Sequence, residues 1–417
     1  MRLTAVSLRL CAIALACGIA GLTACVAPNA TPPPPPPAPQ LVLPPPPVAD
    51  HALTSDSPAF LRLPNLADGQ TPVRVGVILP LASGAPATRA LANAMLKAAQ
   101  LALYDAKNPA IILMTADEGT RPDDAAAAAT KLLAQGAEVI IGPLFGPSVT
   151  AVAPIARDRG VPVLAFSTEK SVAGNGVYLL SFLPQGEVNR VVSYAAAQGH
   201  HNFAAMVPQG AYGDVVAGAY ADAVKSAGAT SLEVEHFTPA ANAVMAPSAL
   251  IAKSQADAVM IAQGGAVLRA IAPDLSFSGL DHNKVKLLGT GLWDDPSLGR
   301  EDVLVGGWFA APELDANAAF ASRYRDTFGA PPPQPQLTSL AYDAVALVAL
   351  LSSGQPYHRF TQAALMDPNG FAGIDGIFRF NVDGTSDRGL AVLEVAPDGL
   401  HVVSPAPKTF QPSASAF

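Results

Sequence analysis

Residues 138–170 read EVIIGPLFGPSVTAVAPIARDRGVPVLAFSTEK, and the architecture follows most directly from this segment. Two short apolar runs at 138–142 and 161–166 are rich in β-branched residues, which is typical of buried parallel strands. Residues 148–159 between them have the length and composition of a helix. A strand, a helix and a second strand at this spacing predict a right-handed βαβ unit in a parallel sheet.

The same alternation extends in both directions along the chain. Before the segment we expect strands at 73–81 and 110–116 and helices at 88–107 and 123–135. After it, strand runs at 177–182, 203–207, 232–237, 257–262 and 285–289 alternate with helices at 187–198, 213–227 and 243–253. Helices at 316–328 and 337–352 precede alternating strands, with hairpin turns at Asp383-Gly384 and Asp398-Gly399. These patterns predict an α/β protein of two lobes, each a mostly parallel sheet flanked by helices, with C-terminal β-hairpins.

The first residues predict export. Residues 1–24 combine Arg2 and Arg9 with an apolar run at 10–20, which is typical of a signal peptide and too short to span a bilayer. The following Leu-Thr-Ala-Cys resembles the bacterial lipobox, in which Cys25 becomes the acylated first residue. An ordinary signal peptide with an incidental Cys25 is the alternative. Val26 resembles the outer-membrane sorting pattern, so we expect a periplasmic lipoprotein anchored to that membrane.

Residues 25–70 form the expected tether. Its proline tracts favour an extended polyproline II chain rather than a packed core, and at ~3.1 Å per residue the segment 26–47 could reach ~65 Å. A stiff spacer suits a protein that contacts a distant partner, although a passive spacer would have the same composition.

Charge and motifs exclude several classes of function. The 417 residues carry a net charge of −8, so no excess of positive charge is available to bind nucleic acid or an anionic membrane surface. The sequence lacks a Gly-x-Ser-x-Gly elbow, a phosphate-binding Gly-Lys-Ser/Thr loop and a His-Glu-x-x-His helix. Of its seven histidines only His200 and His201 are adjacent, and we interpret them as a solvated helix end. We therefore expect no catalytic activity, no cofactor and no metal.

The order of several motifs points to a family. The segments VRVGVILPL, IIGPLFGPSVTAVAPIARDRGVPVLAFST, FAAMVPQGAYGDVVAGAY, GWFAAPE and LAYDAVALVALL together resemble type I periplasmic binding proteins of the leucine-binding group, over nearly the whole chain after residue 71. The resemblance implies three crossings between lobes. It places lobe 1 at 71–183, lobe 2 at 184–308, a return to lobe 1 at 309–366, terminal strands of lobe 2 at 367–404, and a disordered tail at 405–417.

Within that group, the run from Gly142 to Pro184 is most similar to proteobacterial penicillin-binding protein activators, which are lipoproteins that stimulate peptidoglycan synthases. We therefore expect a non-catalytic activator whose partner is such a synthase. The alternative is a substrate-binding protein that carries an amino acid or another small polar ligand to an ABC permease.

Candidate ligand residues follow the predicted strands, because open α/β sheets bind ligands beyond the carboxyl ends of their strands. These candidates are Ser83, Phe145, Ser148, Ser167, Thr168 and Glu169 in the first lobe, and Tyr212, Gln263, Trp293 and Asp294 in the second. Ser148 begins a helix, where it could bind an anion or cap the helix, and capping is favoured. Trp293 is the better candidate for an aromatic anchor, whereas Trp308 is expected in the core.

The resemblance also implies how an amino acid would be held. Relatives that bind amino acids hold the carboxylate with hydroxyls and amides of the first lobe, and the ammonium with an acid and an aromatic residue of the second. Ser167 and Thr168 keep the hydroxyls. The acid and aromatic positions hold Gly291 or Leu292 and Ala262 or Gln263, so Glu169 or Asp294 would have to supply the missing charge.

Overall fold

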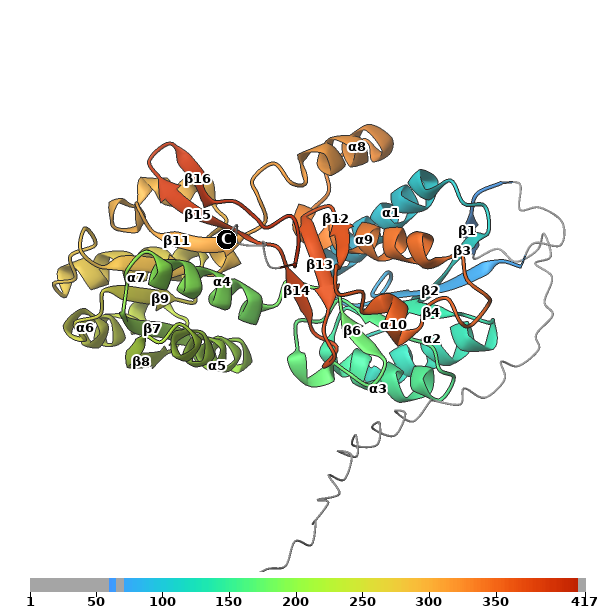
Figure 1. The fold of residues 1–417 in the computed structure, drawn as a ribbon, viewed down its shortest axis with the longest axis horizontal. Helices are drawn as coiled ribbons and strands as arrows, with labels where there is room; N and C mark the ends of the chain where they lie inside the picture. Colours follow the sequence, from blue (N-terminus) through green and yellow to red (C-terminus); the bar gives the residue numbers. More distant parts are fainter. Residues whose placement is uncertain (1–59, 65–70, 412–417) are drawn as a thin grey trace, which may run out of the picture. The chain divides into compact units, whose positions relative to one another are not determined.

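The computed structural model describes residues 60–64 and 71–411, which include a six-stranded, a seven-stranded and a three-stranded sheet (Figure 1). The six-stranded sheet has the order β1-β3-β2-β4-β5-β6, and all pairings from β3 to β6 are parallel. Its strands are β1 (Phe60–Arg62), β2 (Val73–Leu79), β3 (Ile111–Asp117), β4 (Val139–Ile141), β5 (Val163–Ala165) and β6 (Val177–Leu179).

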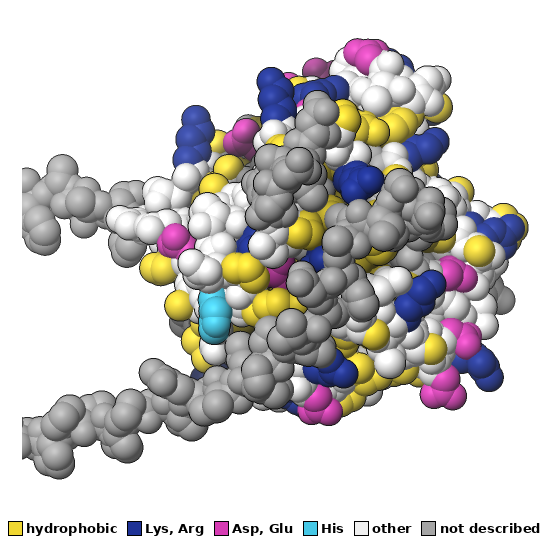
Figure 2. All heavy atoms as spheres, turned by 90° about the vertical axis from the view of Figure 1, so that its right-hand side faces the viewer, with side chains coloured by type: hydrophobic (Ala, Val, Ile, Leu, Met, Phe, Trp, Pro, Cys, Tyr) yellow, Lys and Arg dark blue, Asp and Glu magenta, His cyan; other side chains and the backbone are white. Residues whose placement is uncertain are grey.

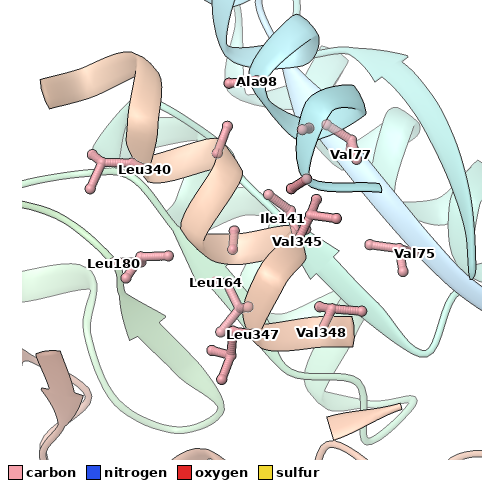
Figure 3. Close-up of a cluster of buried hydrophobic side chains, with 14 of the residues drawn as sticks. Val75, Val77, Ala98, Ile141, Leu164, Leu180, Leu340, Val345, Leu347 and Val348 are labelled. Atoms are coloured by element: carbon pink, nitrogen blue, oxygen red, sulfur yellow. The ribbon is translucent and has the colours of Figure 1, made fainter. Parts of the chain in front are cut away.

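Helices cover both faces of this sheet. Strand β2 therefore carries apolar side chains on both of its faces. Val75 and Val77 face α1 (Pro86–Ala106) and α9 (Pro335–Leu351), where they join the cluster of buried side chains in Figure 3. Ile78 lies on the other face, in the core formed with α2 (Pro122–Ala134) and α3 (Gly146–Arg157). Two apolar faces explain why the strands appear as continuous hydrophobic runs in the sequence.

The seven-stranded sheet has the order β16-β15-β11-β10-β9-β7-β8, in which only β15 runs in the opposite direction, so that its pairings with β11 and with β16 are both antiparallel. Its strands are β7 (Asn202–Pro208), β8 (Thr230–Phe237), β9 (Ala258–Ile261), β10 (Lys286–Gly289), β11 (Trp308–Ala311), β15 (Ala391–Ala396) and β16 (Gly399–Ser404). One face packs against α4 (Pro184–Ala197) and α5 (Ala211–Ser226), and the other against α6 (Met245–Lys253) and α7 (Gly265–Phe277).

The remaining elements are a small third sheet, two further helices and several short 3₁₀ helices. The three-stranded sheet contains β12 (Phe371–Gly373), β13 (Gly376–Phe380) and β14 (Ser386–Arg388), and it follows α8 (Ala318–Phe328) and α10 (Gln362–Leu365). Short 3₁₀ helices lie at Lys170–Val172, Ala241–Ala243, Gly291–Trp293, Pro296–Arg300 and Asp302–Leu304.

Three boundaries differ from those expected from the sequence. Strand β11 pairs with β10 and β15, so the second sheet extends to Ala311 and not only to residue 308. Residues 371–380 carry Phe371, Phe378 and Phe380 into the core of the first lobe, although 367–404 was assigned to the second. Within the segment 25–70, β1 pairs antiparallel with β3, because Phe60 and Leu61 pack on the edge of the sheet.

The surface at the end of the first lobe carries mixed charges. Where side chains are visible, Lys and Arg are interspersed with Asp and Glu on this face (Figure 2). In the described ranges, no helix is both long and apolar enough to cross a membrane. Cys25, the signal peptide and the proline tracts lie outside the described residues.

Candidate functional site

The strand orders locate a candidate site. In the first sheet, β2 has β3 on one side and β4 on the other, so the loops after β2 and β4 leave in opposite directions. The second sheet repeats this arrangement with β7 between β8 and β9. Such switch points open a crevice at the carboxyl ends of the strands. The predicted candidates Ser83, Ser148, Tyr212 and Gln263 follow the four central strands.

The first of these loops is held by a carboxylate that the sequence reading missed. Ser83 Oγ donates to Asp117 Oδ2 at 2.5 Å, and the backbone N–H of Ala82 donates to Oδ1 at 3.2 Å. Burial opposes the ionisation of Asp117, but these hydrogen bonds outweigh it and lower the pKa. The Ser83 hydroxyl therefore already has an acceptor within its own lobe.

A second carboxylate lies at the start of α3. Glu118 is fully buried, and it accepts the N–H groups of Leu144 at 2.8 Å and Phe145 at 3.1 Å and a hydrogen bond from Ser148. Burial raises the pKa of Glu118 in spite of these bonds. The expectation that Ser148 caps α3 is wrong, because Phe145 is the N-cap residue, no side chain caps the helix, and the Ser148 hydroxyl bonds Glu118.

The loop after β5 leaves its polar groups nearer to solvent. Ser167 is buried, and its Oγ accepts the backbone N–H of Glu169 at 3.1 Å. Thr168 and Glu169 are exposed. The Glu169 carboxylate lies so near Gly146 that a Cβ there would be 2.3 Å from it, which explains the glycine. Phe145, 45% exposed, adds an apolar side chain beside these groups.

The second lobe supplies the predicted aromatic residue Tyr212 and an acid, Glu187, that was not among the predicted residues. Tyr212 shares a 2.9 Å hydrogen bond with Thr290 Oγ1, and burial raises its pKa to about 12. Glu187, in the first turn of α4, accepts the N–H of Gly291 at 2.8 Å. Burial raises the pKa of Glu187 to about 7, although that hydrogen bond favours the charged form. The two side chains are close enough that the charge of Glu187 raises the pKa of Tyr212 further.

The prediction that Trp293 is an exposed anchor is wrong. Its side chain is fully buried, and its Nε1 donates to the carbonyl oxygen of Gln263 at 3.0 Å. Room for the indole exists because Gly289 lacks a side chain, since a Cβ there would lie 2.2 Å from the ring. Gln263 is half-buried, and its amide donates to the neighbouring Gly264 carbonyl at 3.3 Å.

Asp294 connects the second sheet to a helix of the first. Its Oδ2 accepts Gln336 Nε2, in the first turn of α9, at 2.7 Å. The residue is exposed as a whole, but desolvation of its carboxyl group raises the pKa. Asp294 and Gly291 also line a pocket of about 600 Å³ together with Gln336.

A charged cluster lies behind that pocket. Asp375 accepts hydrogen bonds from Asn317 at 3.2 Å and from Ser339. Asp343 is buried, which raises its pKa to about 7, and one of its oxygens has no hydrogen-bond partner. Both terminal nitrogens of Arg388 are likewise buried without a partner, while its Nε donates to the Ser181 carbonyl at 3.0 Å.

The predicted first-lobe residues already have partners inside their own lobe. Ser83, Ser148, Ser167 and Glu169 lie in the first lobe, each hydrogen-bonded or packed within that lobe. Among the described residues, no three or more His, Cys, Asp or Glu side chains are grouped as a metal site would need.

Comparison with known proteins gives the following matches. A family model described as periplasmic binding protein matches residues 72–399. The solved structure of a putative branched-chain amino acid ABC transporter from Rhodospirillum rubrum is 18% identical, with a TM-score of 0.70, over 80% of this chain and 100% of that one. A branched-chain amino acid ABC transporter ligand-binding protein from Burkholderia xenovorans is 21% identical, with a TM-score of 0.63, over 82% of this chain and 97% of that one.

Two further matches add context. A solute-binding protein from R. palustris, solved in complex with benzoate, is 18% identical with a TM-score of 0.57, over 82% of this chain and 98% of that one. Among curated proteins, an uncharacterized protein of Rickettsia prowazekii is 23% identical over 106 residues, which are 25% of this chain and 28% of that protein. The chain thus spans less than a third of that relative, and the structural likenesses, all below 25% identity, concern the fold.

Proposed function

Because the chain belongs to the periplasmic binding protein family, we propose that it is a solute receptor of the periplasm that delivers a small polar molecule to an ABC permease. The observation that carries the proposal is the arrangement of polar side chains of both lobes at the carboxyl ends of their strands. The hydrogen bond from Gln336 to Asp294 connects the two groups, because it links α9 of the first lobe to the loop after β10 of the second. The structural relatives described as ABC transporter proteins support the same reading.

The proposed mechanism is ligand-stabilised closure. A molecule that contacts Asp294 or Glu187 on the second lobe and Gln336 or Ser167 on the first binds better when the lobes are held together. Such differential affinity shifts the population toward the closed form, which a permease can recognise. The chain itself contributes binding and orientation to this cycle.

The expected activator of a peptidoglycan synthase is the second candidate. Glu118 favours it, because its carboxylate accepts the N–H groups of Leu144 and Phe145 directly before α3, and these two donors are then not free to hold the carboxylate of an amino acid. The synthase would then bind the protein surface, and closure of the cleft on a ligand would regulate that contact.

Both candidate functions include a lipid anchor at Cys25. The lipobox, the proline-rich segment and Val26 support a lipid anchor in the outer membrane. A Cys25→Ser variant should move from the membrane fraction to the soluble periplasmic fraction. If wild-type protein is already soluble, the anchor is contradicted.

Thermal unfolding of the full-length protein tests the function. The panel contains amino acids, amides, sugars, aromatic carboxylates, amines and muropeptides. A solute at a hundred times its dissociation constant stabilises the native state by about 2.7 kcal/mol, or about 4 °C for a chain of this size. A shift of that size with one class supports the receptor. No shift with any class, together with retention on an immobilised detergent-solubilised synthase, would support the activator instead.

A further inference from the structure

The pocket of about 600 Å³ lies away from the first-lobe loops that the family resemblance indicated. Its walls come from three segments: the loop after β10, the connection after β11, and the start of α9. The polar residues among its lining are Asp294, Glu313, Asn317, Gln334 and Gln336. Its volume is within the range of ordinary small-molecule sites.

The charge of this pocket is unbalanced. Asp294 and Glu313 contribute carboxylates, and none of the described residues that line it is Lys, Arg or His. The nearest bonds to these acids come from neutral donors: Gln336 to Asp294 at 2.7 Å, and the backbone N–H of Ala406 to Glu313 at 2.9 Å. A third carboxylate, Asp375, is close enough behind the wall for its pKa to be raised by Asp294.

Neighbouring arginines do not correct this imbalance. Arg269 is engaged by Asp295 at 3.0 Å and Glu301 at 2.6 Å. Arg388 acts electrostatically on Asp343 and Asp375, which lie behind the pocket wall. A carboxylate partly removed from water and lacking a cation is stabilised by any positive charge that enters beside it.

The remaining lining residues favour an organic cation over a metal ion or an anion. Leu314, Leu337 and two prolines provide apolar surface between the polar groups. Apolar walls suit the carbon skeleton of an organic molecule better than a hydrated metal ion, which prefers a shell of oxygen ligands. An anionic solute would be repelled by both carboxylates.

We propose that this pocket binds a small organic cation, an amine or guanidinium on a short carbon skeleton, with Asp294 as its principal counter-charge and Glu313 as a second. The inference rests on the proposed function, because it names the class of solute that the receptor captures. In the free protein Gln336 donates to Asp294, and a bound ammonium group replaces that donor. Since Asp294 of the second lobe and Gln336 and Leu337 of the first all line the pocket, the solute contacts both lobes.

Isothermal titration of the full-length protein with benzylamine, agmatine and putrescine tests the inference, with benzyl alcohol, 1,4-butanediol and benzoate as matched neutral and anionic probes. At least one amine should bind, and at least tenfold more tightly than its matched neutral probe. Asp294→Asn should weaken that binding tenfold or more, and Glu313→Gln about threefold. Asp222→Asn, which removes one negative charge from the exposed face of α5, should leave it within twofold.

Two further measurements guard against a folding artefact. Asp294→Asn keeps an acceptor for Gln336, so its unfolding midpoint without ligand should match that of the wild type. Amine affinity of the wild type should fall severalfold between 50 and 500 mM NaCl, as an ionic contact requires. Amines that fail to bind at millimolar concentration, or that bind Asp294→Asn as well as the wild type, would overturn the inference. Binding of benzoate or a sugar alone would overturn it and leave the solute receptor intact, whereas no binding of any probe would count against both.

Discussion

Replacing Glu187 by Gln should stabilise the protein at neutral pH and leave it unchanged in mild acid. Burial raises the pKa of Glu187 from 4.5 to about 7, and its hydrogen bond comes from the Gly291 backbone rather than from a cation. Because its folded pKa is above its unfolded pKa, the folded state binds more protons between these values, and wild-type stability falls as the pH rises through this window. Gln cannot ionise, but it keeps an oxygen acceptor for Gly291.

The size of the effect follows from the shift. One pKa unit corresponds to about 1.4 kcal/mol, so a shift of about 2.5 units gives an upper bound of about 3 kcal/mol at pH 8. Below about pH 4.5 both forms of residue 187 are neutral and the difference vanishes. Above pH 7 the difference should be constant.

Urea denaturation between pH 4 and pH 8 measures this difference. Both tryptophans of the chain, Trp293 and Trp308, lie in the second lobe with Glu187, so their fluorescence reports on the relevant part of the protein. Asp222→Asn is the matched control, since it removes a carboxylate from an exposed position of the same lobe and should change stability by less than about 0.5 kcal/mol. An equal difference between Glu187→Gln and wild type at pH 4 and pH 8 would refute the reasoning.

Three further variants test the packing and the charged cluster. Leu340→Ala, at a site only 1% exposed, should cost about 2–5 kcal/mol in urea denaturation, whereas Leu350→Ala on the same helix, 66% exposed, should stay within about 0.5 kcal/mol. Gly384→Ala places a Cβ at φ +80° within 2.3 Å of facing backbone atoms, so it should cost about 1–3 kcal/mol or more; an unchanged unfolding midpoint would contradict that geometry. Arg388→Met should destabilise more at pH 8 than at pH 5, because the charge of Arg388 favours ionised Asp343, and without it the pKa of Asp343 rises above its wild-type value of about 7; a pH-independent loss would exclude this coupling.

The order of strands and helices could be predicted because local pattern determines it. Apolar runs flanked by polar loops mark buried strands wherever both faces are covered. Helix starts were placed late at α1, α2, α4 and α9, since each begins at a proline that the pattern assigned to the preceding loop. Proline is favoured in the first helical turn, where its missing N–H has no partner to lose. Strand β1 was missed because only three residues pair, within a proline-rich stretch.

The site was harder to predict because its partners are distant in sequence. Ser83 and Ser148 follow the expected strands, but their acceptors, Asp117 and Glu118, lie 34 and 30 positions away in the chain, at the end of a third strand. Glu187 meets Gly291 across 104 positions. The available signal was the pair of acids at the end of β3, where Asp117 is the last residue of the strand and Glu118 follows it at the same edge of the sheet.

Trp293 shows how local polarity can mislead. It precedes Asp294 and Asp295, which suggests an exposed loop. Its burial depends on Gly289 and Gly307, whose missing side chains leave space for the indole ring. The residues next to Trp293 in the sequence do not indicate this space, because the glycines that create it lie in a neighbouring strand and loop.

The interleaving of the chain between the lobes also constrains when each lobe can fold. The first-lobe core joins Val75 and Val77 to Val345 and Phe378, and the second sheet is completed only when β15 pairs with β11. Neither core can be closed by a chain that ends at Ala311, because α9 and the terminal strands are still missing. Contacts of such long sequence separation slow folding and prolong exposure of apolar strands. Neither lobe therefore completes its native packing before these C-terminal segments are available.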